Sequence, residues 1–295
     1  MNESALKERL KILAVEKEST MNKIWKQLLL ERFLARLSTS RYHNKFIFKG
    51  GLLLAQYIAI RRETMDIDFL MTKMQSEAQK IEAAIQEVAV IDTEDGFYFA
   101  WHSIEELNQP HMTYPGFRVM LDVSFGKMQD KIQLDIGVGD VVEPLSTVFV
   151  PFEYKGKPIF SGEISLYVYP PEAIFSEKLE TVIAKGAMNS RMKDYHDLLL
   201  MIREPNFLDL KKLAGTIHTT FKRRGTPIKL PIQFDDVGMY SLQKYWRNHL
   251  HALGILRERL NFPVQLSTVI NEINDLIVGL HIGDHSVSPE RMTIE

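Results

Sequence analysis

Residues 46–70, FIFKGGLLLAQYIAIRRETMDIDFL, carry the pattern from which the fold is predicted. The apolar run 46–48 predicts a strand that ends at Lys49, Gly50 and Gly51, because a glycine pair permits a positive φ or a close approach of the backbone. Residues 52–60 predict a helix. A strand, a glycine turn and a helix N-terminus direct backbone N–H groups toward one point, and such a point suits an anion such as a triphosphate.

Asp66 and Asp68 stand in a predicted strand, 66–70, in which side chains alternate between two faces. The two carboxylates therefore share a face, where they repel each other unless a cation lies between them. Mg²⁺ takes oxygen ligands from carboxylates and substrate phosphates, and Mn²⁺ can substitute for it. A D-x-D pair alone more often marks the exposed face of an edge strand. The fourteen residues 52–65 between turn and acids fit one helix and a return loop, which favours a joint metal and phosphate site.

Residues 49–69 resemble the first motif of the AbiEii/AbiGii nucleotidyltransferase toxins, which include the MenT toxins and belong to the DNA polymerase β-like nucleotidyltransferase superfamily. The matching positions are Gly50, Gly51, Arg61 or Arg62, Thr64, Asp66, Asp68 and Phe69. Gly51 stands where the wider superfamily has serine, which removes a hydroxyl contact to the phosphates. The resemblance implies an NTP substrate bound by Lys49, Gly50, Gly51, Arg61 and Thr64, and Mg²⁺ or Mn²⁺ held by Asp66 and Asp68.

A third acid is expected from the predicted β-hairpin 116–139, whose strands meet at residues 126–130. Asp122 and Asp135 each stand alone among apolar residues, and a buried aspartate is costly unless it is paired or bound to a metal. The resemblance favours Asp135 as the third catalytic and metal-binding carboxylate. Asp122 is the competing choice, and an aspartate that only caps backbone groups is a further alternative.

A second group of candidate residues lies on two predicted helices, 171–185 and 191–202. Asp194 and Asp197 share a helix face, which by periodicity alone indicates surface charge. The sequences E-K-L at 177–179 and R-x-K-D-x-x-D-L at 191–198 resemble later motifs of the toxin family. The resemblance implies that Lys178 is a catalytic residue that also binds a nucleotide phosphate, and that Asp194 is a catalytic residue. It further implies that the nucleotide is bound by Arg191, Lys193 and Asp197.

Hydrophobic periodicity predicts the remaining elements. Helices are expected at 4–18, 23–37, 75–88, 208–223, 237–260 and 264–280, and strands at 88–91, 97–104 and 164–169. An acidic loop is expected at 92–96, a loop-rich segment at 140–163 and a frayed tail at 283–295. The charged residues of the first two helices are expected to be solvated. The predicted fold class is α/β (α+β): a mixed-sheet nucleotidyltransferase domain with flanking helices, 1–169, and a helical bundle, 170–295, that completes the active site.

Composition limits the cellular setting. The 295 residues are 45% hydrophobic and 25% charged, as in a soluble globular protein, and no apolar stretch approaches the ~18 residues of a membrane span. The absence of cysteine excludes disulfides and thiolate metal sites, and the polar N-terminus is no signal peptide, so a cytoplasmic protein is expected. A net charge of −2 gives no overall attraction for nucleic acid, so RNA binding requires local basic patches, found at 61–62, 185–193 and 222–224.

The resemblance implies a bacterial toxin of a toxin–antitoxin or abortive-infection (phage defence) system that transfers NMP to tRNA or another RNA 3′ end. The expected partner is an antitoxin: a protein, a transcriptional regulator or a kinase-like enzyme. In some relatives the antitoxin phosphorylates the residue at the position of Thr64, which makes Thr64 a predicted switch. Two alternatives remain: a nucleotide-binding protein that acts by gripping a partner, and a small-molecule nucleotidyltransferase.

Overall fold

The computed structural model describes residues 1–60, 62–107, 116–254 and 256–280. Contacts within the chain divide it into two compact units, Met1–Pro170 and Pro171–Glu295, and each is described by itself. Arg61 and the predicted frayed tail 283–295 lie outside the described residues. The helices found in the described residues include none long and apolar enough to cross a membrane.

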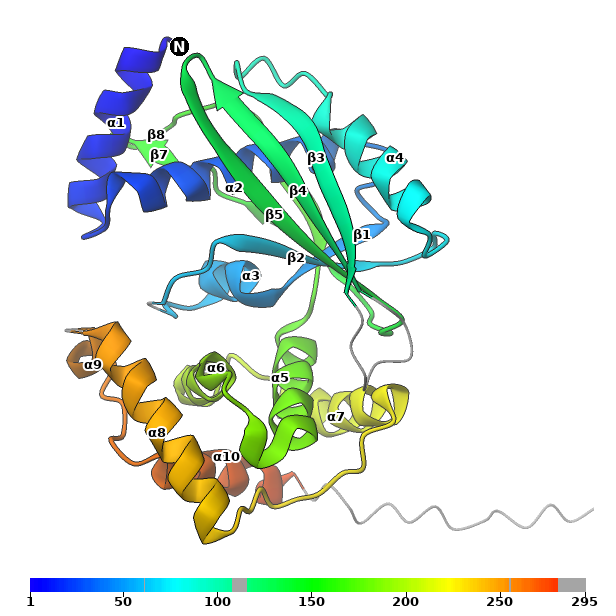
Figure 1. Ribbon diagram of the computed structural model, residues 1–295, viewed down its shortest axis with the longest axis vertical. Helices are drawn as coiled ribbons and strands as arrows, with labels where there is room; N and C mark the ends of the chain where they lie inside the picture. Colours follow the sequence, from blue (N-terminus) through cyan, green and yellow to red (C-terminus); the bar gives the residue numbers. More distant parts are fainter. Residues whose placement is uncertain (61, 108–115, 255, 281–295) are drawn as a thin grey trace, which may run out of the picture. The chain divides into compact units, whose positions relative to one another are not determined.

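Unit 1 is built on a seven-stranded sheet of strand order β3-β4-β5-β2-β1-β9-β6 (Figure 1). The pairs β2–β5 and β1–β9 are parallel and the other pairs are antiparallel, so the sheet is mixed, which confirms the predicted fold class. The strands are β1 (Phe46–Lys49), β2 (Asp66–Met71), β3 (Tyr98–Leu107), β4 (Gly116–Phe125), β5 (Met128–Val138), β6 (Leu145–Phe149) and β9 (Ile164–Val168), and a separate hairpin holds β7 (Glu153–Tyr154) and β8 (Lys157–Pro158).

The sheet has one apolar face and one polar face. Along β4 every second side chain is buried, from Phe117 to Phe125, as period-two alternation requires. The described residues of unit 1 also form four helices, of which α2 contacts β5 and β9, α3 contacts β1 and β2, and α4 contacts β3. Figure 1 shows α2 passing behind β3, β4 and β5, and α4 to the right of β3. The helices are α1 (Glu3–Glu16), α2 (Met21–Thr39), α3 (Gly50–Tyr57) and α4 (Ala78–Ala89).

Three predicted elements of unit 1 are wrong in type or extent. The predicted strand 88–91 does not form: Val88 and Ala89 end α4, because Ile81, Ile85 and Val88 recur at helical spacing and are buried together. The predicted loop 140–163 contains β6, which pairs with β9. The helix predicted at 52–60 begins at Gly50 itself and ends at Tyr57.

Two arginines of α2 are buried rather than solvated, which corrects the expectation for this helix. Arg32 and Arg36 are each 1% exposed. Arg36 donates two hydrogen bonds of 2.8 Å to Asp95, in the loop that was predicted from its acidic residues, and another to the Phe97 carbonyl. Burial alone would raise the pKa of Asp95, but the contacts with Arg36, with the Phe97 N–H and with Thr93 hold that pKa below its ordinary value.

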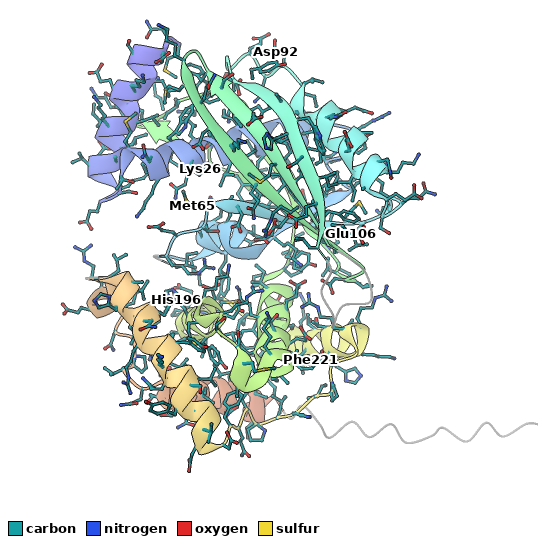
Figure 2. All side chains as sticks on the ribbon, viewed as in Figure 1. Lys26, Met65, Asp92, Glu106, His196 and Phe221 are labelled. Carbon is teal, nitrogen blue, oxygen red and sulfur yellow. The ribbon has the colours of Figure 1, made fainter. Side chains whose placement is uncertain are left out.

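Unit 2 is helical throughout its described residues. Its members are α5 (Pro171–Lys185), a short 3₁₀ turn (Gly186–Met188), α6 (Met192–Arg203), α7 (Leu210–Arg224), α8 (Asp236–Leu253), α9 (Leu256–Arg259) and α10 (Leu266–Gly279). The single helix predicted at 237–260 is instead two, because Gly254 ends α8 with a φ of 56°. His196 and Phe221 (Figure 2) are fully buried in this unit, so His196 is a core residue.

Candidate active site

The glycine turn connects β1 directly to α3. Gly50 is the first residue of α3 and has a φ of +78°, in the left-handed region that favours glycine. A Cβ atom at Gly50 would lie 1.9 Å from Oδ2 of Asp68. A Cβ atom at Gly51 would lie 2.7 Å from Nη2 of Arg62 and 3.1 Å from Oγ1 of Thr64. The two glycines therefore allow the backbone at the start of α3 to approach the predicted site residues closely.

The acidic pair lies on the polar face of the sheet. Asp66 and Asp68 are half-buried, whereas Ile67 and Phe69 between and after them are fully buried on the opposite face. The register pairs Asp68 with Lys49 on β1 and with Asp135 on β5. Paired residues of neighbouring strands project from the same face, so these three charged side chains form one row across the sheet.

Asp135 and its competitor Asp122 occupy different positions. Asp135 is a direct cross-strand neighbour of Asp68. Asp122 lies on β4, which is separated from β2 by β5, and its carboxylate pairs with Nδ1 of His102 at 3.0 Å and with Nζ of Lys131 at 3.6 Å. Hydrogen bonding to His102 lowers the pKa of Asp122. The geometry thus brings Asp135, and not Asp122, beside the acidic pair.

Asp135 is held by an arginine that the sequence reasoning missed. Arg118 donates from Nε to Oδ1 at 2.9 Å and from Nη2 to Oδ2 at 2.8 Å, and Gln133 donates to Oδ1 at 3.1 Å. The signal was available in the hairpin: a two-residue turn at Gly126 and Lys127, with Phe125 opposite Met128, places residue 118 opposite residue 135.

The oxygen donors of the acidic pair suit Mg²⁺ or Mn²⁺ in chemical type. Asp66 and Asp68 supply carboxylates on one strand face, and the Thr64 hydroxyl, 3.4 Å from Oδ1 of Asp66, adds an oxygen beside them. Within the described ranges, however, no group of three or more acidic or histidine side chains is arranged to hold a metal ion. Asp135 has the right register position for a third ligand, but Arg118 engages both of its oxygens.

Lys49 and Thr64 flank the acidic pair from two sides. The ammonium of Lys49 lies 3.7 Å from Asp140, 3.4 Å from the Tyr169 hydroxyl and 4.7 Å from the centre of the Tyr169 ring. Thr64 is only 8% exposed, and its hydroxyl donates to Asp66. Asp140 and Tyr169 were not singled out from the sequence, because only the fold brings the end of β9 next to β1.

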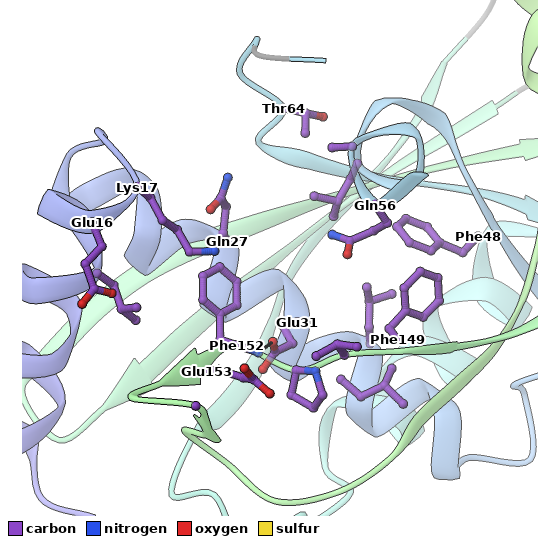
Figure 3. A pocket seen from close by; sticks show the side chains of 18 of the residues that line it. Glu16, Lys17, Gln27, Glu31, Phe48, Gln56, Thr64, Phe149, Phe152 and Glu153 are labelled. Atoms are coloured by element: carbon purple, nitrogen blue, oxygen red, sulfur yellow. Dashed lines mark hydrogen bonds between the residues drawn. The ribbon is translucent and has the colours of Figure 1, made fainter. Parts of the chain in front are cut away.

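A cavity of about 700 Å³, lined in part by α3, opens beside Thr64 and Arg62 (Figure 3). Its wall includes the buried carboxylate of Glu31, which accepts a hydrogen bond from the Phe152 N–H, and the ammonium of Lys17 lies over the Phe152 ring. Burial raises the pKa of Glu31, against the opposing effect of the Arg32 charge. The cavity shares Thr64 with the acidic site but contains none of the predicted carboxylates.

The second group of predicted residues lies in unit 2, on α5 and α6. Lys178 is 2.6 Å from Oδ2 of Asp197 and 3.5 Å from Oδ1 of Asp194, and Arg191 lies 3.0 Å from Oδ2 of Asp194. Both aspartates are at most 1% exposed, so they are buried ion-pair partners and not the surface charge that periodicity indicates. Lys193 is exposed. The structure thus gathers Lys178, Asp194 and Asp197 in unit 2, and Asp66, Asp68 and Asp135 in unit 1.

Known proteins resemble this chain through one family model and two solved structures. A comparison with curated proteins gave no match. Two crystal structures of Helicobacter pylori proteins resemble the chain. The first is JHP933, with a TM-score of 0.49 and 15% identity, and the match covers 89% of this chain and 93% of JHP933. The second is a candidate nucleotidyltransferase, with a TM-score of 0.46 and 14% identity, and the match covers 89% of this chain and 96% of that protein. The family model described as "Nucleotidyl transferase AbiEii toxin, Type IV TA system" matches residues 32–263. This match spans most of the chain, which therefore belongs to the AbiEii family of nucleotidyltransferase toxins.

Proposed function

We propose that this nucleotidyltransferase toxin transfers NMP from an NTP to the 3′ end of an RNA, with tRNA as the leading acceptor, in a reaction that requires Mg²⁺ or Mn²⁺. The single observation that carries the proposal is the packing of the Gly50 turn against Asp68, next to Asp66 on the same strand face. A phosphate-binding helix start and a carboxylate pair then act on one substrate.

Each residue of unit 1 has a defined task in this proposal. The N–H groups at the start of α3, with Lys49, bind the triphosphate, and Thr64 keeps Asp66 in place through its hydrogen bond. Asp66 and Asp68 would hold the divalent cation, and Asp135 would join them as the third carboxylate. When bound, the cation offsets charge on the phosphates and makes the acceptor hydroxyl more acidic. Asp135 would orient that hydroxyl.

Unit 2 contributes phosphate and acceptor binding in this proposal. Lys178, oriented by Asp194 and Asp197, binds a phosphate group of the NTP, with Arg191, Lys193 and Asp197 as further nucleotide-binding residues. RNA would bind through local basic residues, because the net charge of −2 provides no general attraction. Lys222 and Arg223 at the end of α7 are exposed, whereas Arg224 is paired with Glu177 and Glu180.

The biological setting follows from the family. A type IV toxin–antitoxin family implies an antitoxin partner and an NTP substrate. We propose a protein antitoxin, either a transcriptional regulator or a kinase-like enzyme, and a role in the cytoplasm in abortive infection and defence against phage. Co-expression with the neighbouring gene, followed by growth measurement, tests this role.

The central experiment incubates purified protein with each labelled NTP in turn, with Mg²⁺ and total RNA. We expect label to appear on RNA 3′ ends for at least one NTP. Asp66→Ala and Asp68→Ala should each abolish transfer and toxicity without lowering the melting temperature, because removing one of two repelling carboxylates does not destabilise the metal-free protein. Asp275→Ala, an exposed aspartate of α10, is the matched control and should keep full activity.

The same experiment separates the alternatives. Label on a small molecule but not on RNA would identify a small-molecule nucleotidyltransferase. Nucleotide binding without any labelled product would identify a protein that acts by gripping a partner. Wild-type transfer by either aspartate variant would show that the assignment of the metal ligands is wrong.

A further inference from the structure

Arg118 lies within a row of charged side chains that crosses five strands on the polar face of the sheet. The register pairs Glu105 on β3 with Arg118, Arg118 with Asp135, Asp135 with Asp68, and Asp68 with Lys49. The signs along the row are therefore negative, positive, negative, negative and positive. Neighbouring like charges in a sheet repel, so the two adjacent acids, Asp135 and Asp68, require a nearby cation.

In this structure Arg118 is the cation that pairs with Asp135, and Lys49 is the cross-strand cation beside Asp68. The Arg118 guanidinium makes two parallel hydrogen bonds to Asp135, of 2.9 and 2.8 Å, and Gln133 donates a third at 3.1 Å. A two-bond arginine–carboxylate pair is specific in geometry. A metal ion could therefore reach Asp135 only if Arg118 moved away.

We propose that Arg118 is a positioning residue that competes with the divalent cation for Asp135 and thereby sets how much metal the protein requires. The proposal rests on the proposed function, in which Asp135 is the third carboxylate. Arg118 would hold Asp135 in place and relieve its repulsion from Asp68 before the cation binds. The cation would then take over the same electrostatic task.

The surroundings of Arg118 allow this exchange. Its side chain is 38% exposed and that of Asp135 is 22% exposed, so the pair is accessible to solvent. Glu105 on β3 is the other cross-strand neighbour of Arg118. It is exposed, and it lies on the same face of the sheet as Arg118 and Asp135. Arg118 can therefore turn from Asp135 to Glu105 and keep an acidic neighbour, which lowers the cost of its release.

The test measures Mn²⁺ binding by the full-length protein without nucleotide, from the electron paramagnetic resonance signal of free Mn²⁺. Arg118→Gln should lower the Kd for Mn²⁺ by about three- to fivefold, the size of effect expected for one partly exposed charge pair. The matched control is Lys131→Gln, which removes a cation paired with Asp122 in the same hairpin and should leave the Kd unchanged. Arg118→Lys, which keeps the charge but cannot form both hydrogen bonds, should have an intermediate Kd.

A double variant decides whether the effect acts through Asp135. Arg118→Gln combined with Asp135→Asn should lose the gain in Mn²⁺ affinity. In this double variant the Asp135 carboxylate, which the loss of Arg118 makes available to the cation, is absent. Unchanged Mn²⁺ affinity in folded Arg118→Gln and Arg118→Lys, or a gain that persists in the double variant, would overturn the proposal. Melting curves confirm folding, and if Arg118→Gln fails to fold, Arg118→Lys alone decides.

The metal titration also distinguishes this proposal from the proposed function. Mn²⁺ binding is measured without transfer, so an absence of labelled RNA would refute the function and leave the role of Arg118 to be decided by the Kd values. Conversely, RNA labelling together with an unchanged Kd in Arg118→Gln would support the function and refute the role of Arg118.

Discussion

Gly50 and Asp68 show how one missing side chain creates a binding position. The space that a Cβ atom would take at Gly50 is filled by the Asp68 carboxylate, and the φ of +78° adds backbone strain for any other residue. The carboxylate can therefore lie against the first turn of α3, where the N–H groups point. The glycine is required by contact as well as by conformation.

Gly50→Ala should reduce the transfer rate by about 100-fold, because the new methyl group displaces Asp68 and displacements near 1 Å have effects of this size. Gly156→Ala is the matched control: Gly156 also has a positive φ, +71°, but a Cβ atom there would meet nothing within 4 Å. Backbone strain is thus common to both variants, and only the contact differs. Similar losses of transfer in the two variants would show that strain, and not the Asp68 contact, explains the result.

A modification of Thr64 would act directly on the acidic pair. The Thr64 hydroxyl lies 3.4 Å from Asp66, so a phosphate there would add nearly two negative charges beside the acidic pair. Such a group would repel an incoming triphosphate or bind the cation itself.

We therefore expect Thr64→Glu to lose toxicity and Thr64→Val to keep most of it in a growth assay. Co-expression with the neighbouring gene should yield a toxin heavier by about 80 Da, the mass of one phosphoryl group. Thr64→Glu with full toxicity, together with an unmodified toxin mass, would exclude a switch at this residue.

At the scale of elements, α2 is anchored by charge as well as by apolar packing. The Arg36–Asp95 pair links α2 to the loop before β3, and both residues are at most 4% exposed. A buried ion pair is weak evidence of net stabilisation, but loss of one partner leaves an uncompensated charge. The sequence predicted this segment, 92–96, only as an acidic loop and did not indicate that Asp95 is buried.

Asp95→Asn should lower the free energy of unfolding by about 3–5 kcal/mol at pH 7, the cost of a buried unpaired charge. The pKa of Asp95 is depressed in the folded state, so its contribution is present above the unfolded pKa near ~4 and is lost as pH falls through the folded pKa. The difference between wild type and variant in urea unfolding should therefore shrink in acid. Asp92→Asn, an exposed neighbour in the same loop (Figure 2), should change stability by less than about 0.5 kcal/mol. Equal losses for both variants would contradict the anchoring role.

At the scale of the whole molecule, the predicted site residues are divided between two compact units. The acidic pair belongs to the sheet of unit 1, and Lys178 belongs to the helices of unit 2, where it is 11% exposed and paired with Asp194 and Asp197. A role for Lys178 in phosphate binding therefore requires that it act while it remains paired.

Lys178→Ala should raise the KM for NTP and lower kcat/KM by about 100-fold, because a charge-assisted contact to phosphate is lost, whereas Lys185→Ala should have little effect. Lys178→Ala also removes the cation that the buried acids Asp194 and Asp197 share, so the melting temperature of the variant should fall, although Asp194 keeps its contact with Arg191. The double variant Lys178→Ala/Asp197→Asn removes one of those acids and should recover stability but not transfer. Recovery of transfer would show that Lys178 acts only through folding.

The elements whose physical signals are local could be predicted from the sequence. Period-two alternation revealed β4 and β5, and the glycine pair marked the turn before α3, because both depend on neighbours along the chain. The same local rules could not distinguish the end of α4 from a strand, since a four-residue apolar run fits both. They also missed β6, whose pairing partner lies about twenty residues further along the chain.

Which charges meet is set by the strand order and by the packing of the helices. Asp122 and Asp135 are equivalent as isolated acids in one hairpin, and the strand order alone places Asp135 next to Asp68 and Asp122 two strands away. Arg36 and Lys178 each carry a charge that the sequence assigns to no particular partner. Partner choice depends on distance across strands and helices far apart in the chain, because the interaction between charges and the cost of burying them are set by three-dimensional separation and solvent access.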